Sequence, residues 1–293
     1  MDNHLLLRQT HGINSSLVLI SGASGGLGKA LAVECASRGW DLYLTDLNEA
    51  NLETLATCLR ATYAVKVHYS ACDLTDAAAR SALFERFRTQ NLHFWALLNV
   101  AGTDYEGYFL ELSRQQIRTI IRLNVEATLE MTHNLVGLRD PLVPFRIVNV
   151  ASLAAFYPMP VKATYAASKR FLLDFSRALN EELRDQDVSV TVLCPAGMPT
   201  TPETIKAIDA QGWAGFVTTQ SVGDVAASTV DAALKGRAVV IPGFVNQVLQ
   251  AFSALLPASL LVHWIGSRWK KAHYERKVEG NREKLVQGVG VKG

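Results

Sequence analysis

The stretch Leu17–Gly28, which reads LVLISGASGGLG, decides the fold of this chain. Its first four residues are large and apolar, which predicts a short buried strand. The glycines that follow have the spacing G-x-x-x-G-x-G, and an alanine- and leucine-rich helical segment then continues as far as Arg38. Glycine lets the backbone turn tightly and approach a pyrophosphate, whose charge would meet the N-terminus of the helix. A glycine turn without a ligand is the alternative.

The rest of the chain repeats this alternation of strand and helix. Such regularity implies right-handed crossovers and a parallel sheet with helices on both faces. The sequence therefore predicts a doubly wound α/β fold of the Rossmann type with about seven strands. Further strands are expected at residues 41–45, 65–70, 95–100, 145–150, 188–193 and 238–241, and helices near Asn48, Thr75, Ser113, Thr164 and Ser221.

The composition describes a globular protein. Of the 293 residues, 49% are apolar and 19% are charged, and the net charge is +2. These values do not fit a disordered chain and give no reason to expect a nucleic acid partner. The four cysteines form no CxxC pair and have no histidine at a zinc-site spacing, so neither a metal site nor a disulfide framework is predicted. Reduced thiols in the cytoplasm are the expectation.

One domain with additions is expected. Residues 1–14 form a leader with a short apolar part and no small-residue cleavage site, which does not fit a secretory signal. Residues 15–242 form the Rossmann-type domain. Residues 243–293 form a C-terminal extension that is first apolar and helical and then basic.

Asp46 lies eighteen residues after Gly28, at the end of the second predicted strand. An acidic side chain at this place can bond the adenine ribose hydroxyls of a dinucleotide and repel a 2′-phosphate. No arginine follows Asp46 directly, so the pattern favours NAD over NADP. The alternative is an ordinary turn or capping aspartate.

Tyr165 and Lys169 lie four residues apart in a predicted helix and therefore share one helical face. Neither is expected on a core-facing stripe. A nearby cation favours the phenolate, so we expect Lys169 to lower the pKa of Tyr165 from its usual value near 10. By itself the pair also fits a solvated helix. Asn124 interrupts an apolar stripe and is either a structural amide or a candidate to hold a water molecule.

With these residues in view, the chain resembles the short-chain dehydrogenase/reductase family over residues 15–242. The glycine turn resembles the family's TGxxxGxG motif, and Ser152 precedes Tyr165 by the usual thirteen residues. Two departures are Val100, in place of an asparagine, and Ala196, in place of a glycine. The other matching segments are the Asp73-Leu74 pair, Asn99–Gly102 for NNAG, Pro195–Thr200 for PGxxxT, and the tetrad Asn124, Ser152, Tyr165 and Lys169.

The resemblance implies an oxidoreductase that interconverts a secondary alcohol and a ketone with NAD, NADP being less favoured. Tyr165 would exchange the proton, Lys169 would hold the nicotinamide ribose, and Ser152 would bond the substrate oxygen. Asn124 would hold a water that links Lys169 to solvent. A homodimer or homotetramer is implied. The expected cofactor-binding residues are Gly22, Ser24, Gly26, Leu27, Gly28, Asp46, Asp73, Leu74, Asn99, Ala101, Gly102, Tyr165, Lys169, Pro195, Met198 and Thr200.

The segments that line the substrate site in this family are apolar here. They predict a lipophilic substrate of acyl, steroid or aromatic type, although bulky loop residues also serve as lid packing. Two other functions stay open: an NADPH-dependent carbonyl reductase of a lipid intermediate at a membrane surface, and a non-catalytic dinucleotide-binding scaffold. The candidate substrate residues are Ser152, Ala154, Tyr157, Met159, Trp213 and Phe216.

The C-terminal extension has an unusual charge pattern. No charged residue occurs from Ala238 to Ser267, and five basic residues follow by Lys277. The apolar residues recur at helical spacing, and Pro257 divides them into two helices. The extension can pack over the active site or a second subunit, or residues 244–277 can lie against a membrane. A membrane span is the poorest alternative because of Pro257 and His263.

Overall fold

The computed structural model describes residues 16–200, 205 and 218–253, and then residues 255–257, 259–263, 265–267, 269–270 and 273–274. Over these residues the chain forms a seven-stranded parallel sheet in the order β3-β2-β1-β4-β5-β6-β7. The predicted doubly wound fold is confirmed. The strands are β1 (Leu17–Ser21), β2 (Leu42–Asp46), β3 (Val67–Ala71), β4 (Phe94–Asn99), β5 (Phe145–Val150), β6 (Val188–Leu193) and β7 (Val239–Val240).

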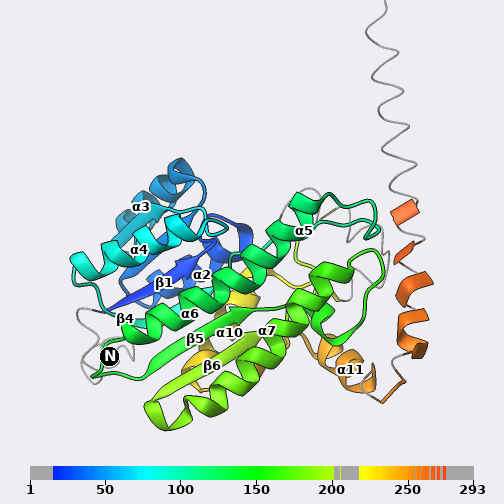
Figure 1. The fold of residues 1–293 in the computed structure, drawn as a ribbon. Coiled ribbons are helices and arrows are strands. Elements are labelled where there is room, and N and C mark those ends of the chain that lie inside the picture. Colours follow the sequence, from blue (N-terminus) through cyan, green and yellow to red (C-terminus); the bar gives the residue numbers. More distant parts are fainter. Residues whose placement is uncertain are drawn as a thin grey trace, which may run out of the picture.

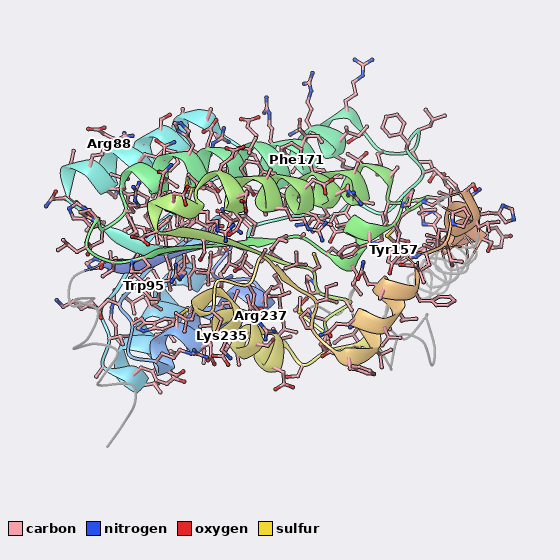
Figure 2. All side chains as sticks on the ribbon, turned by 90° about the horizontal axis from the view of Figure 1, so that it is seen from below. Arg88, Trp95, Tyr157, Phe171, Lys235 and Arg237 are labelled. Atoms are coloured by element: carbon pink, nitrogen blue, oxygen red, sulfur yellow. The ribbon has the colours of Figure 1, made fainter. Side chains whose placement is uncertain are left out.

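Helices cover the sheet on both faces, as Figure 2 shows in side view. One hydrophobic core lies between the sheet and α2 (Gly26–Ser37), α3 (Glu49–Tyr63) and α10 (Val222–Leu234). The second lies between the sheet and α4 (Ala77–Thr89), α6 (Thr128–Gly137) and α7 (Ala163–Glu182). The shorter elements are α5 (Arg114–Ile121), the π-helical η1 (Arg122–Ala127), and the 3₁₀ helices η2 (Leu153–Phe156) and η3 (Arg184–Gln186).

Side-chain caps set several helix starts. Asn48 accepts a 3.0 Å hydrogen bond from the backbone of Asn51, and Ser113 forms a capping box with Gln116. The helix expected from Thr75 instead begins at Ala77, because Asp76 caps it by accepting from Ala78 N at 3.0 Å. Because Asp76 serves as the N-cap, the helix starts two residues later than the sequence predicted.

The strand order reverses between β1 and β4, which places their carboxyl ends side by side. Ser21 pairs with Asn99 at this point. Gly22 follows with a φ of 64°, and a Cβ atom there would lie 2.7 Å from the backbone of Ala101. Only glycine fits this close approach, so the glycine turn and the segment after β4 form one crevice.

The extension begins with α11 (Phe244–Ser253), and Pro257 separates it from shorter helical turns, as predicted. Figure 1 shows α11 and the later turns at the same end of the molecule as α5. Among the described residues, no helix combines the length and the apolar character needed to cross a membrane. Large apolar side chains are exposed along this region: Phe244, Val245, Val248, Leu249, Phe252, Leu255, Leu256 and Leu260.

Candidate active site

The fold gathers the four candidate catalytic side chains beyond the ends of β4 and β5. Ser152 follows β5, and its hydroxyl is hydrogen-bonded to Tyr165 on the first turn of α7. Lys169 lies one turn further, with its Nζ 5.7 Å from the centroid of the Tyr165 ring. A Cβ atom on Gly102 would lie 3.2 Å from both Lys169 Nζ and Asn124 Oδ1. Segments from three parts of the chain therefore meet at one spot.

Burial governs the two ionisable groups. Desolvation lowers the pKa of Lys169 to about 8, although the negative charge of Asp104 acts in the opposite direction. Desolvation, aided by Asp104, raises the pKa of Tyr165 to about 12, and the hydrogen bond with Ser152 only partly offsets this. The expectation that the nearby lysine lowers the tyrosine pKa is therefore wrong, because desolvation dominates.

Lys169 is also not on a solvated face: its exposed fraction is 4%. Its ammonium donates a 2.8 Å hydrogen bond to the carbonyl oxygen of Val150, the last residue of β5. A buried lysine is rare unless it is paired, so the solvated-helix alternative fails. The sheet edge thus supplies an acceptor that holds the ammonium beside the tyrosine.

Asn124 is fully buried on the π-helical turn η1. Its Nδ2 donates to Thr103 O and to Ser168 Oγ, both at 3.0 Å, and its Oδ1 accepts from Thr103 N at 2.8 Å. Both amide hydrogens are thereby used, and the oxygen already accepts one hydrogen bond, so only its second lone pair is left for a water. The proposed water relay stays a prediction, and the structural role of this amide is now explicit.

The glycine turn fits a pyrophosphate. A Cβ atom on Gly28 would lie 2.0 Å from Gly22 O, and one on Gly26 would lie 2.5 Å from Cγ2 of Thr200. Helix α2 starts behind this turn with no side-chain cap and no acidic residue in its first turn, so its N-terminus is open to an anion. Thr200 of the PGxxxT segment lies against the same turn, and its role in binding a cofactor stays a prediction.

Asp46 lies against this turn. Its Oδ2 accepts from Ser24 N at 2.9 Å and its Oδ1 from Leu47 N at 2.6 Å. The carboxylate thereby joins the end of β2 to the glycine turn, and the next side chain, Leu47, is an exposed leucine instead of a cation. The end of β2 therefore presents a carboxylate and has no cation at the next position.

Other residues of the predicted cofactor set serve the interior. Asn99 Nδ2 donates to Asn149 Oδ1 at 2.9 Å and to Thr132 Oγ1 at 3.1 Å, so its side chain points into the protein. Leu27 and Leu74 are buried in the cores. Asp73 accepts from Thr75, which shapes the turn after β3. Among the remaining members, Pro195 accepts from Leu153 N at 2.9 Å, and Met198 packs against the core.

Three of the predicted substrate residues lie near Ser152. Ala154 is buried in η2, and Tyr157 and Met159 follow it on the way to α7. The hydroxyl of Tyr157 accepts from Ser253 Oγ at 3.3 Å, which joins this loop to α11 (Figure 2). Trp213 and Phe216 lie outside the described residues.

The last described turns pack against the loops that flank Tyr165. The ring of Trp269 lies 5.1 Å from Lys162 Nζ, and His273 Nδ1 lies 3.3 Å from Glu106 Oε1. Lys162 in turn pairs with Asp104. Sequence reasoning missed Asp104 and Lys162, because charged loop residues far apart in the chain carry no motif.

Comparison with known proteins agrees with this geometry. The family model for short chain dehydrogenases matches residues 16–211. The chain belongs to the short chain dehydrogenase family. This confirms the resemblance inferred from the motifs and places the chain in a family of nicotinamide-dependent oxidoreductases.

Relatives within the family differ in activity. A very-long-chain 3-oxoacyl-CoA reductase of Scheffersomyces stipitis is 33% identical over 184 residues, which is 60% of this chain and 53% of that protein. The inactive hydroxysteroid dehydrogenase-like protein 1 of Homo sapiens is 32% identical over 60% of this chain and 54% of its own length. The chain thus spans about half the length of these relatives.

A solved structure shares the fold over most of the chain. The short-chain dehydrogenase from Sphingobium yanoikuyae in complex with NADPH is 26% identical, has a TM-score of 0.67, and covers 83% of this chain and 96% of its own.

Proposed function

We propose that this protein is an NAD-preferring oxidoreductase that interconverts a secondary alcohol and a ketone. The observation that carries the proposal is the hydrogen bond between Ser152 and Tyr165, with the buried ammonium of Lys169 beside them. The nicotinamide would supply or accept the hydride. Ser152 would bond the substrate oxygen, and Tyr165 would give or take its proton.

The protonation of Tyr165 determines how the two reaction directions would depend on pH. Burial raises the pKa of this phenol to about 12, so the phenol keeps its proton at neutral pH. A protonated phenol can donate to a carbonyl oxygen as the hydride arrives at carbon. Oxidation instead needs the phenolate, which forms only at higher pH.

The preference for NAD rests on Asp46. Its carboxylate lies against Ser24 of the glycine turn, where a 2′-phosphate would meet like charge. The related structure from Sphingobium yanoikuyae binds NADPH, so the family likeness does not decide this point. The carboxylate does support NAD.

A lipophilic substrate is supported by two observations. The loop between Ser152 and α7 offers Ala154, Tyr157 and Met159 near the catalytic hydroxyl groups. The relative from Scheffersomyces stipitis is named for a very-long-chain acyl substrate. We therefore place the substrate among acyl, steroid or aromatic carbonyl compounds.

A second candidate is carbonyl reduction of a lipid intermediate at a membrane surface. The apolar side chains exposed along α11 and the turns after it favour this candidate, since such patches mark interaction surfaces. The basic residues that follow in the sequence suit an anionic lipid surface. A non-catalytic scaffold is disfavoured by the complete tetrad, although a relative is named inactive.

One experiment tests the main proposal. Purified protein is assayed with NADH and NADPH against a panel of hydrophobic ketones and open-chain sugars, and Tyr165→Phe is assayed in parallel. We expect turnover of hydrophobic ketones, lost by at least about 100-fold in the variant, with NADH binding nearly unchanged. Preferential turnover of sugars would contradict the substrate class. Appreciable activity of Tyr165→Phe would contradict the catalytic assignment.

A further inference from the structure

A second lysine flanks the catalytic tyrosine. The Nζ of Lys162 lies 5.7 Å from the centroid of the Tyr165 ring, the same distance as the Nζ of Lys169. Lys169 belongs to the family tetrad, but Lys162 belongs to no motif. Two ammonium groups therefore lie equally close to the tyrosine ring, one from the family tetrad and one from outside the motifs of this sequence.

Helix stability does not explain why a lysine stands here. Lys162 is the N-cap residue of α7, and its side chain makes no capping hydrogen bond. A cation at this end opposes the helix dipole, which favours negative charge near the N-terminus. A small polar residue would be the ordinary choice at this position. The lysine must therefore be stabilised by other groups.

Those groups are two carboxylates of the loop after β4. Lys162 forms an ion pair and a hydrogen bond with Asp104, and its Nζ lies 3.5 Å from Glu106 Oε2. The side chains of Lys162 and Asp104 are only 16% and 27% exposed. Solvent therefore screens this pair less than it would screen an exposed pair.

The backbone around the pair is held on both sides. Asn124 binds both backbone polar groups of Thr103, the residue before Asp104. Val161, the residue before Lys162, is buried, has a φ of 72°, and accepts a 2.9 Å hydrogen bond from Gly107 N. A β-branched residue in the left-handed region is strained, and such strain persists only where surrounding contacts enforce it.

We propose that Lys162 is a positioning residue of the active site, which neutralises Asp104 beside Tyr165 and thereby sets the pH at which the phenol can lose its proton. This inference rests on the proposed role of Tyr165. Asp104 alone opposes phenolate formation, because a negative charge disfavours a second one nearby. Lys162 carries the opposite charge and pairs with Asp104, so its removal would leave that carboxylate without this partner beside the phenol. Trp269 covers the ammonium from the C-terminal side and so joins the extension to this site.

Several other charged or titratable groups face this cluster among the described residues. Lys169 comes from α7 itself, and Glu106 comes from the same loop as Asp104. His273 reaches Glu106 from the C-terminal turns, and Cys194 acts on Lys169 from the end of β6. The test must therefore change Lys162 and Asp104 separately and together.

The test follows the phenol directly and needs no substrate. Protein with tyrosine labelled by ¹³C at Cζ is titrated by NMR from pH 7 to 11 with saturating NAD, and Tyr165→Phe identifies the resonance. Oxidised NAD carries a positive charge on its nicotinamide ring, which favours the phenolate and should bring the Tyr165 midpoint from about 12 into this range. We expect Asp104→Asn to lower the Tyr165 midpoint and Lys162→Met to raise it, each by about half a pH unit to one pH unit. The double variant should return close to wild type, because the pair's net charge is again zero.

Controls separate this role from a structural one. Lys162→Arg keeps the charge and should restore the wild-type midpoint, while Lys235→Met changes an exposed lysine on the opposite face of the sheet and should leave it unchanged (Figure 2). Circular dichroism at each pH verifies the fold. Equal midpoints in Asp104→Asn, Lys162→Met and wild type, or shifts in the same direction, would overturn the proposal. If Tyr165→Phe stays active instead, the catalytic assignment fails while this titration still reports on Lys162.

Discussion

The side chain of Asn124 binds both backbone polar groups of Thr103: Oδ1 accepts from the N–H group at 2.8 Å, and Nδ2 donates to the carbonyl at 3.0 Å. These two hydrogen bonds resemble one rung of a sheet ladder, made by an amide side chain. They attach the loop after β4 to the π-helical turn η1. Asp104, the next residue, is thereby held where its charge acts on Tyr165 and Lys169.

Asn124→Ala should destabilise the protein by about 1–3 kcal/mol, because it leaves buried polar groups of Thr103 without partners. Chemical denaturation monitored by circular dichroism measures this loss. Asn134→Ala, which changes an amide nearer the surface of α6, is the matched control and should cost about 0.5 kcal/mol or less. Equal losses in the two variants would show that the Thr103 bonds contribute nothing particular.

The two reaction directions should differ in their dependence on pH. The phenol of Tyr165 has its pKa raised to about 12 in the cofactor-free protein. Oxidation needs the deprotonated form, so its kcat/KM should rise with pH from 7 toward 10, whereas reduction should stay nearly flat from 6 to 8. Initial rates across this range, with a hydrophobic ketone and its alcohol, check the expectation. An oxidation rate that is flat across neutral pH would contradict it.

Asp46→Ser should weaken NAD binding by roughly tenfold and strengthen NADP binding, because it removes the carboxylate that bonds ribose hydroxyls and repels a 2′-phosphate. Quenching of tryptophan fluorescence measures both dissociation constants. Asp41→Ser alters a carboxylate at the other end of β2, which accepts from Lys66 N, and serves as control. If wild type already binds NADP as tightly as NAD, Asp46 does not act as proposed.

Arg80 should contribute strongly to stability. It is fully buried and donates to Leu74 O at 2.6 Å, to Glu126 at 2.5 Å and to Glu130 at 2.7 Å, which joins α4 to η1 and α6. Arg80→Met removes all of these hydrogen bonds and should cost about 2–3 kcal/mol in the free energy of unfolding. Arg88→Met, on the exposed side of α4, should change it by less than about 0.5 kcal/mol (Figure 2).

The pairing of Glu130 with Arg80 should appear in the pH dependence of stability. The hydrogen bond from Arg80 lowers the pKa of Glu130 in the folded protein. Its contribution is therefore present above the unfolded pKa, near 4.3, and is lost as the pH falls through the folded pKa. Glu130→Gln should lower the melting temperature at pH 7 but hardly at pH 3. The effect should be small because the side chain is 40% exposed.

The apolar side chains along α11 and the following turn should bind a lipid surface. Cosedimentation with vesicles of phosphatidylcholine and phosphatidylserine measures the bound fraction, and the double variant Phe252→Ser/Leu255→Ser should lower it several-fold. Leu110→Ser/Leu142→Ser removes two leucines outside the extension that are even more exposed, and is the matched control. An equal loss of vesicle binding in both variants would show nonspecific adsorption through exposed apolar residues, and not binding by the extension in particular.

The motif residues of the site could be predicted because they are close in sequence or stand at family spacings. Tyr165 and Lys169 share a helical face because they are four residues apart. The glycines of the first turn indicate a backbone that turns tightly and can approach a ligand closely. The predicted dimer or tetramer and the cytoplasmic location stay predictions. They depend on surfaces and partners that no local pattern encodes.

The sequence by itself determined the alternation of strands and helices, the glycine turn and the shared helical face of Tyr165 and Lys169, because these follow from hydrophobic period, backbone freedom and short-range spacing. Only the tertiary structure decided the protonation of the site. Burial raises the pKa of Tyr165 despite the nearby lysine, and the chain brings Asp104 and Lys162, 58 residues apart, into contact beside it. Desolvation and Coulomb interactions depend on distances and surroundings in space, which no spacing along the chain specifies.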